Sequence, residues 1–141
     1  MPDTPRHSVS VAGAVINDDG LVLAIRRADN GHWEPPGGVL ELGETIEAGL
    51  VREIQEETGL TVKPERLTGV YKNMQRGIVA LVFRCTATDG SAKRTDEARE
   101  IAWLSPTEIT ERMEPAYAIR LLDALDDLGP AVRAHDGHQL C

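Results

Sequence analysis

The sequence predicts a single α/β domain, because strand-like apolar runs alternate along it with amphipathic helical segments. Its 141 residues suit one hydrophobic core. Hydrophobic content of 41% and charged content of 27% are ordinary for a globular protein. We expect the domain to span residues 1–130 and to be followed by a mobile tail over 131–141.

The strands are predicted from short apolar runs bounded by turn residues. They are expected over 9–16, 21–25, 67–71, 77–86 and 100–104. The first two are joined by a turn at 17–20 that carries the Asp-Gly hairpin signal. Two polar stretches, 28–38 and 88–99, are expected to be loops.

Three helices are predicted from their end signals. The first runs from 44 to 58, and Gly59 is a natural C-terminal stop. A second begins at Ser105, an N-cap residue followed by proline at the first helical position. The third spans 115–128, with apolar residues on one face. That face comprises Ala118, Leu121, Leu122, Leu125 and Leu128.

Composition excludes several classes of protein. The formal net charge of −8 disfavours binding to the backbone of duplex nucleic acid. No run approaches the ~18 apolar residues of a membrane span, and the N-terminus lacks the apolar core of a signal peptide. Cys85 and Cys141 form neither a metal motif nor a disulfide framework. A reducing cytoplasm is therefore the expected location.

Residues 38–60 carry the strongest chemical signal, the pattern G-x5-E-x7-R-E-U-x-E-E-x-G-U, with U an apolar residue. At ~100° per residue, Glu53, Glu56 and Glu57 share an arc of roughly 100° on the helix. Carboxylates this close repel one another, and a hard divalent cation would relieve that repulsion. Arg52 lies four residues before Glu56, where it can pair with it and orient it. The alternative is a solvated acidic face with a purely structural role.

This stretch resembles the signature box of the Nudix (MutT-like) hydrolases. The similarity extends to the preceding Trp-Glu-Pro-Pro-Gly-Gly at 33–38 and to the order of strands and helices around the box. The resemblance implies an α/β/α sandwich on a mixed sheet, with the box forming a loop-helix-loop. It also implies Mg²⁺- or Mn²⁺-dependent hydrolysis of a nucleoside diphosphate linked to another group, X.

The resemblance assigns roles to individual positions of the box. The implied metal ligands are Glu53, Glu56, Glu57 and the carbonyl of Gly38. Arg52 joins the three glutamates as a catalytic residue with an orienting role, and Glu44 and Gly59 support the box structurally. Glu53 and Glu56 are both candidates for the general base, and the choice between them is open.

Residues outside the box are expected to complete the site. Family members often add a carboxylate from a later loop, and here either Glu97 or Glu100 would supply it. Arg26 and Arg27 end the second predicted strand close to the lead-in loop. Either could bind a phosphate through a bidentate guanidinium contact, although a solvated strand end is an equal alternative.

The expected partner is a small-molecule nucleotide. The lead-in to the box is similar to that of members that cleave nucleoside triphosphates, so a triphosphate giving the monophosphate and pyrophosphate is the favoured substrate. ADP-ribose or another nucleotide sugar is the alternative. A non-catalytic nucleotide-binding sensor is the alternative of another class. The resemblance also allows a homodimer.

Overall fold

The computed structural model describes residues 3–141. Its strands are β1 (Ser8–Val15), β2 (Val22–Arg27), β3 (Trp33–Glu34), β4 (Gly37–Val39), β5 (Thr61–Asn73), β6 (Ile78–Asp89), β7 (Ala98–Leu104) and β8 (Ala131–His135). Its helices are α1 (Ile46–Thr58), α2 (Pro106–Arg112) and α3 (Pro115–Ala124). Among residues 3–141, no helix combines the length and apolarity needed to cross a bilayer.

The strands form two sheets. The larger has the order β4-β1-β6-β5-β8, and the smaller has the order β3-β2-β7. In the larger sheet β1 runs parallel to β6 and β5 runs parallel to β8, whereas β1–β4 and β5–β6 are antiparallel. The main sheet is therefore mixed.

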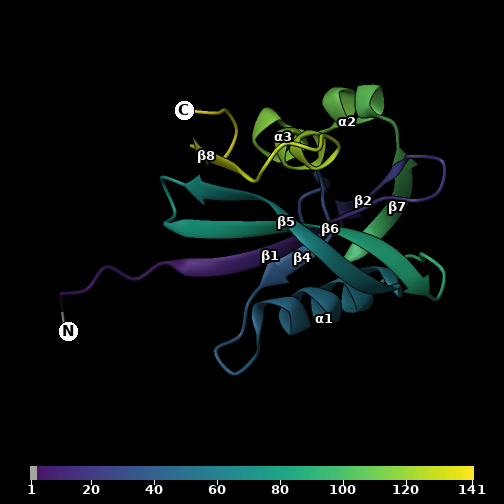
Figure 1. The fold of residues 1–141 in the computed structure, drawn as a ribbon, viewed down its shortest axis with the longest axis horizontal. Helices are drawn as coiled ribbons and strands as arrows, with labels where there is room; N and C mark the ends of the chain where they lie inside the picture. Colours follow the sequence, from purple (N-terminus) through teal and green to yellow (C-terminus); the bar gives the residue numbers. More distant parts are fainter. Residues whose placement is uncertain (1–2) are drawn as a thin grey trace.

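Helices cover both faces of the main sheet, with α1 on one side and α2 and α3 on the other (Figure 1). The alternation of side chains along β1 explains the two cores. Val11 and Val15 pack with Leu50 and Ile54 of α1, whereas Ala14 packs in the core that contains helix α3. The structure thus confirms the predicted α/β/α sandwich.

Local signals define the two ends of α1. The Thr45 hydroxyl accepts a hydrogen bond from the Ala48 N–H at 3.2 Å, which caps the first turn. Gly59 adopts a φ of 80°, and its N–H donates to the Gln55 carbonyl. Gly59 is thus the C-terminal stop of α1 that the sequence indicated. Helix α2 begins with the expected N-cap at Ser105, extended into a capping box by Glu108.

Several element bounds differ from those predicted. Strands β5 and β6 extend to 61–73 and 78–89, and the expected loop at 28–38 contains the two short strands β3 and β4. Helix α3 ends at Ala124 instead of residue 128, and Leu128 is 73% exposed. The prediction that Leu128 belongs to the apolar face of α3 is therefore wrong.

The expectation of a mobile tail over 131–141 is wrong for its first half. Residues 131–135 form β8, which pairs in parallel with β5 from Gly69 to Asn73. Arg133 bonds to Asp123 of α3, and His135 is fully buried. These long-range partners hold a segment that has no strong local signal of its own. The domain boundary at residue 130 stays a prediction.

Candidate active site

The three box glutamates lie along one edge of α1 but differ sharply in exposure. The Glu57 residue is only 2% exposed, whereas the Glu53 side chain is 13% exposed and that of Glu56 is 51% exposed. Glu57 thus lies at the buried end of this edge and Glu56 at its open end. The helical spacing predicted that these residues share a face, but not how differently each would be solvated.

Arg52 links the acidic residues of the box. Its guanidinium donates two hydrogen bonds to Glu44, at 2.6 and 2.9 Å. The same group pairs with Glu53 at 3.0 Å and with Glu56 at 3.3 Å. Hydrogen bonds from Arg52 and from the Glu41 N–H lower the pKa of Glu44 to about 2. This geometry matches the orienting role expected for Arg52 and the supporting role expected for Glu44.

The glycines of β4 bring backbone directly against the carboxylates. The Gly37 N–H donates to Glu57 Oε1 at 2.6 Å. A side chain at Gly38 would collide with the Glu53 carboxylate, and one at Gly37 would collide with the Val11 carbonyl. Gly37 therefore allows β4 to lie close to the backbone of β1, and Gly38 allows it to lie close to the Glu53 carboxylate of α1.

Burial and mutual repulsion shift the pKa values of two glutamates upward. Burial is the main cause at Glu57, with further contributions from Glu97 and Glu53, and its pKa rises to about 8 despite the Gly37 hydrogen bond. Burial also raises the pKa of Glu53, and Glu56 and Glu97 add to the effect, while Arg52 opposes it. Without a cation, these carboxylates are held in an environment that disfavours their charged forms.

The surroundings of the two late-loop glutamates distinguish them. Glu100 forms an ion pair with Arg26 at 2.9 Å. Glu97 instead acts electrostatically on both Glu53 and Glu57. Of the two alternatives left open by the sequence, Glu97 is the one whose charge adds to the upward shift of the Glu53 and Glu57 pKa values, and its role as a ligand stays a prediction.

The two candidate arginines also have different partners. Arg26 bonds to Glu100 and to the Gly31 carbonyl, which keeps it at the end of β2. Arg27 bonds to Asp29 and lies 3.7 Å from Glu34, and it lines a cavity beside β4. Arg27 is therefore the better placed of the two to meet a ligand.

The chemistry of the box suits a hard divalent cation. Its donors are carboxylate oxygens and the Gly38 carbonyl, and Glu57 is a buried acid with one backbone hydrogen bond. In the side-chain arrangement seen here, no three His, Cys, Asp or Glu residues within 3–141 converge as a ready metal site. The Arg52 guanidinium lies among the box carboxylates. Metal binding would therefore require the Glu53 and Glu56 side chains to turn away from it.

A cavity of about 180 Å³ adjoins the box on the other side of β4. Gly37, Gly38 and Arg27 line it together with Glu34, and Tyr117 and Arg120 of α3 close it. The sequence alone did not indicate a ligand role for Glu34, Tyr117 or Arg120. A signal did exist for one of them. Arg120 lies midway between Ala116 and Ala124 at i, i+4 spacing, so it is a charged residue on a buried stripe.

Comparison with known proteins identifies the family. Residues 6–125 match the NUDIX domain. A MutT-like protein of Streptomyces ambofaciens is 62% identical over 136 residues, covering 96% of this chain and 88% of that protein. An ADP-ribose pyrophosphatase of Methanocaldococcus jannaschii is 38% identical over 101 residues, covering 67% of this chain and 60% of that protein.

Solved structures agree with this assignment. A Nudix hydrolase from Nitrosomonas europaea superposes with a TM-score of 0.79 at 22% identity, covering 94% of this chain and 81% of that one. A MutT protein from Methanosarcina mazei superposes with a TM-score of 0.73 at 26% identity, covering 85% and 93%. With a matching domain over residues 6–125 and a MutT-like relative that is 62% identical, the chain belongs to the Nudix family.

Proposed function

We propose that this protein is a Mg²⁺-dependent pyrophosphohydrolase that cleaves a phosphoanhydride bond of a nucleoside diphosphate linked to X. The observation that carries the proposal is the excess of carboxylate at the edge of α1. Glu53 and Glu57 lie against the Gly37–Gly38 backbone, and the charge of Glu97 helps to raise the pKa of both. An acidic cluster of this kind is suited to bind an anionic ligand only together with cations.

Glu53, Glu56, Glu57 and the Gly38 carbonyl would hold the metal, and Glu97 would add a further oxygen. A bound Mg²⁺ or Mn²⁺ supplies charge neutralisation at phosphate oxygens and acidifies a coordinated water. The chain's own groups then have separate tasks. Arg52 keeps the Glu44 side of the box fixed, and Glu56, the exposed member, is open to water as a proton acceptor. Arg27 lines the adjoining cavity and can bind a phosphate.

We infer that the preferred substrate is a nucleoside triphosphate, which would yield the monophosphate and pyrophosphate. Relatives named as nucleoside triphosphatases support this, including one from Escherichia coli that is 29% identical over 113 residues. The relative named as an ADP-ribose pyrophosphatase supports the alternative of a nucleotide sugar. The cavity beside β4 opens next to the box, so either ligand could place its non-phosphate part there.

A nucleotide panel with and without Mg²⁺ tests the proposal. We expect pyrophosphate release from triphosphates that depends on Mg²⁺ and is lost in Glu56→Gln. Glu47→Gln is the matched control, because Glu47 lies on the same helix but is exposed in its first turn. Saturable nucleotide binding without any product would contradict the proposal and favour a sensor. Equal activity of the two variants would reject the assigned metal site.

A further inference from the structure

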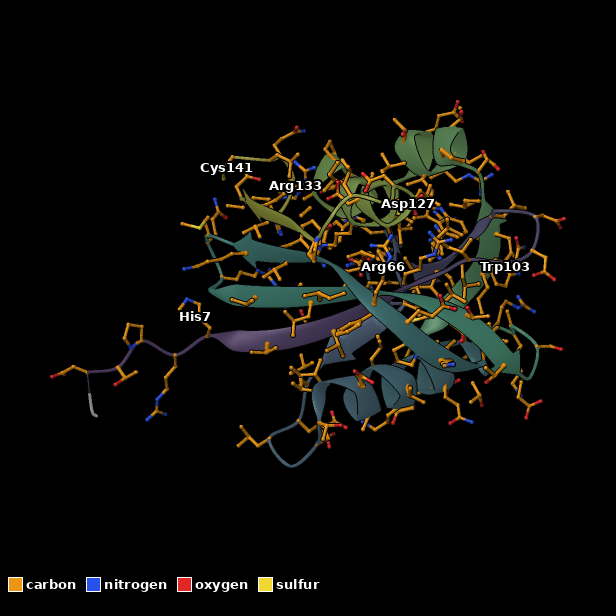
Figure 2. The ribbon with its side chains drawn as sticks, in the orientation of Figure 1. His7, Arg66, Trp103, Asp127, Arg133 and Cys141 are labelled. Atoms are coloured by element: carbon orange, nitrogen blue, oxygen red, sulfur yellow. The ribbon has the colours of Figure 1, made fainter. Side chains whose placement is uncertain are left out.

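The loop of residues 90–97 closes the C-terminal end of α1. It leads from β6 into β7, the strand labelled at Trp103 in Figure 2. The last carbonyl groups of a helix have no partner within it. The Lys93 N–H donates to one of them, that of Thr58, at 2.9 Å. A Cβ atom at Gly59 would lie only 2.9 Å from the Lys93 side chain, so the loop packs directly against the end of the helix.

Thr95 links this loop to the backbone of a box glutamate. Its half-buried hydroxyl donates to the Glu57 carbonyl at 2.9 Å and accepts from the Ala98 N–H at 3.2 Å. The Thr95 N–H donates in turn to the Ala98 carbonyl at 3.0 Å. Residues 95 and 98 are therefore held together, with Glu97 between them, and one hydroxyl ties this turn to α1.

The backbone of Glu97 has a second anchor at the end of β2. Its carbonyl accepts a hydrogen bond from the Ala28 N–H at 3.0 Å. The register between β2 and β7 shifts nearby, between Arg26 and Arg27, and irregularities of this kind redirect side chains. The Glu97 side chain is exposed, so its own packing does not fix its position. The placement of this carboxylate thus depends on the backbone links through Thr95 and Ala28.

We propose that Thr95 is a positioning residue of the active site, whose hydroxyl holds the turn of Glu97 against α1 so that Glu97 can share a metal ion with the box glutamates. Thr95 is not itself a ligand, because its hydroxyl already donates to one backbone group and accepts from another. The inference rests on the proposed function, since it concerns the metal of the same site. A hydroxyl that only capped α1 would affect stability and leave metal binding unchanged.

Binding of Mn²⁺ without nucleotide tests this role, with the free ion measured by electron paramagnetic resonance. Thr95→Val keeps the shape of the side chain but removes the hydroxyl. We expect it to weaken Mn²⁺ binding by about tenfold, as is typical when a group that orients a metal ligand is lost. Thr95→Ser, which restores the hydroxyl, should recover an affinity close to that of wild type.

The matched control is Thr68→Val. The buried Thr68 hydroxyl also donates to a backbone carbonyl, that of Val82 in the main sheet, at 3.1 Å. This control removes the same kind of hydrogen bond from a position that does not carry Glu97, so Mn²⁺ affinity should not change. Thermal unfolding of both valine variants measures the structural part of each hydroxyl. If Thr95→Val lowers the melting temperature but binds Mn²⁺ as wild type does, Thr95 is only a cap and the inference is wrong.

A double-mutant cycle with Glu97→Gln shows whether Thr95 acts through Glu97. In the Glu97→Gln background, Thr95→Val should cause little further loss of Mn²⁺ affinity, because the ligand that Thr95 positions has already been removed. Equal losses in the two backgrounds would mean that Thr95 acts on α1 directly, which would also overturn the inference.

The same variants separate this inference from the proposed function. In the hydrolysis assay, Thr95→Val should need about tenfold more Mg²⁺ for half-maximal rate and approach the wild-type kcat at saturating Mg²⁺. Mn²⁺ binding that depends on Thr95 and Glu97, without release of pyrophosphate, would support the positioning role and contradict the proposed hydrolysis. Mg²⁺-dependent hydrolysis with no effect of Thr95→Val on either metal measurement would overturn the positioning role and leave the proposed function standing. Absence of saturable Mn²⁺ binding in wild type would overturn the positioning role as well.

Discussion

The two faces of the main sheet carry opposite imbalances of charge. On the α1 face, Glu44, Glu53 and Glu56 share the single guanidinium of Arg52. On the α3 face, the buried Arg120 has no carboxylate partner among the described residues. Each imbalance costs stability in the free protein, since a buried charge without full compensation is unfavourable. The surplus is thus negative on the α1 face and positive at Arg120 on the α3 face.

Strand β4 connects the two faces. The Gly37 N–H bonds to Glu57 on the α1 side, and Gly37 and Gly38 also line the cavity that Arg120 closes. A ligand with its phosphates at the box could therefore extend across β4 toward α3. Substitutions on the acidic face, in β4 and on the α3 face should therefore affect catalysis and stability to different extents.

The largest effect is expected on catalysis from Glu57→Gln. We expect the rate of triphosphate hydrolysis in Mg²⁺ to fall by about 10²–10⁴-fold, because the variant removes a charged oxygen from the acidic cluster. Stability in metal-free buffer at pH 7 should be retained or raised, because the variant no longer has to take up on folding the proton that Glu57, with its pKa of about 8, binds at this pH. Pyrophosphate release and urea unfolding measure the two effects. A rate equal to that of Glu47→Gln would remove Glu57 from the site.

The next effect is a pH dependence of stability in metal-free buffer. Glu57 keeps its proton in the folded protein up to a pKa of about 8, but loses it near 4.5 when unfolded. Between these values the folded state binds more protons, so its contribution to the unfolding free energy falls as pH rises. The slope should be at most about 1.4 kcal/mol per pH unit. Urea unfolding should show this slope in wild type and a smaller one in Glu57→Gln, and equal slopes would contradict the assignment.

A smaller effect is expected from glycine substitutions in and around β4. Gly37→Ala should lower the unfolding free energy by about 3 kcal/mol, because its methyl group meets the backbone of Val11 and Ala12. Gly38→Ala meets only the flexible Glu53 side chain, so it should reduce activity more than stability. Gly43→Ala is the control, as open space surrounds that position. Chemical denaturation gives the unfolding free energy of all three variants. Their comparison separates the cost of a clash with backbone from that of a clash with the Glu53 carboxylate.

The smallest effect is expected from Tyr71→Phe on the α3 face. The buried Tyr71 hydroxyl donates to Asp123 Oδ2 at 2.8 Å. Losing it should cost about 1 kcal/mol, because Asp123 keeps its two bonds from Arg133. Thermal unfolding should show a modest decrease with the hydrolysis rate unchanged. A collapse of activity would mean that this face is coupled to the acidic box.

The acidic helix, its C-terminal stop and the strand at the start of the chain could be predicted from the sequence. The stop at Gly59 and the i, i+3, i+4 spacing of the glutamates are local features, so they can be read without knowledge of the fold. The helix start was less exact: it was expected at residue 44, whereas α1 begins at Ile46 after an N-cap at Thr45. The sandwich around the helix was predicted from the resemblance to the Nudix box and not from periodicity.

The fold, in contrast, determines which distant residues approach the box and which lack partners. It brought Glu97 rather than Glu100 toward the carboxylates, made a strand of residues 131–135, and buried Arg120 against His135 across the end of the sheet. The physical reason is that burial and pairing depend on contacts between segments far apart in the chain. Local spacing encodes the helix, but it does not encode what the rest of the fold places opposite each side chain.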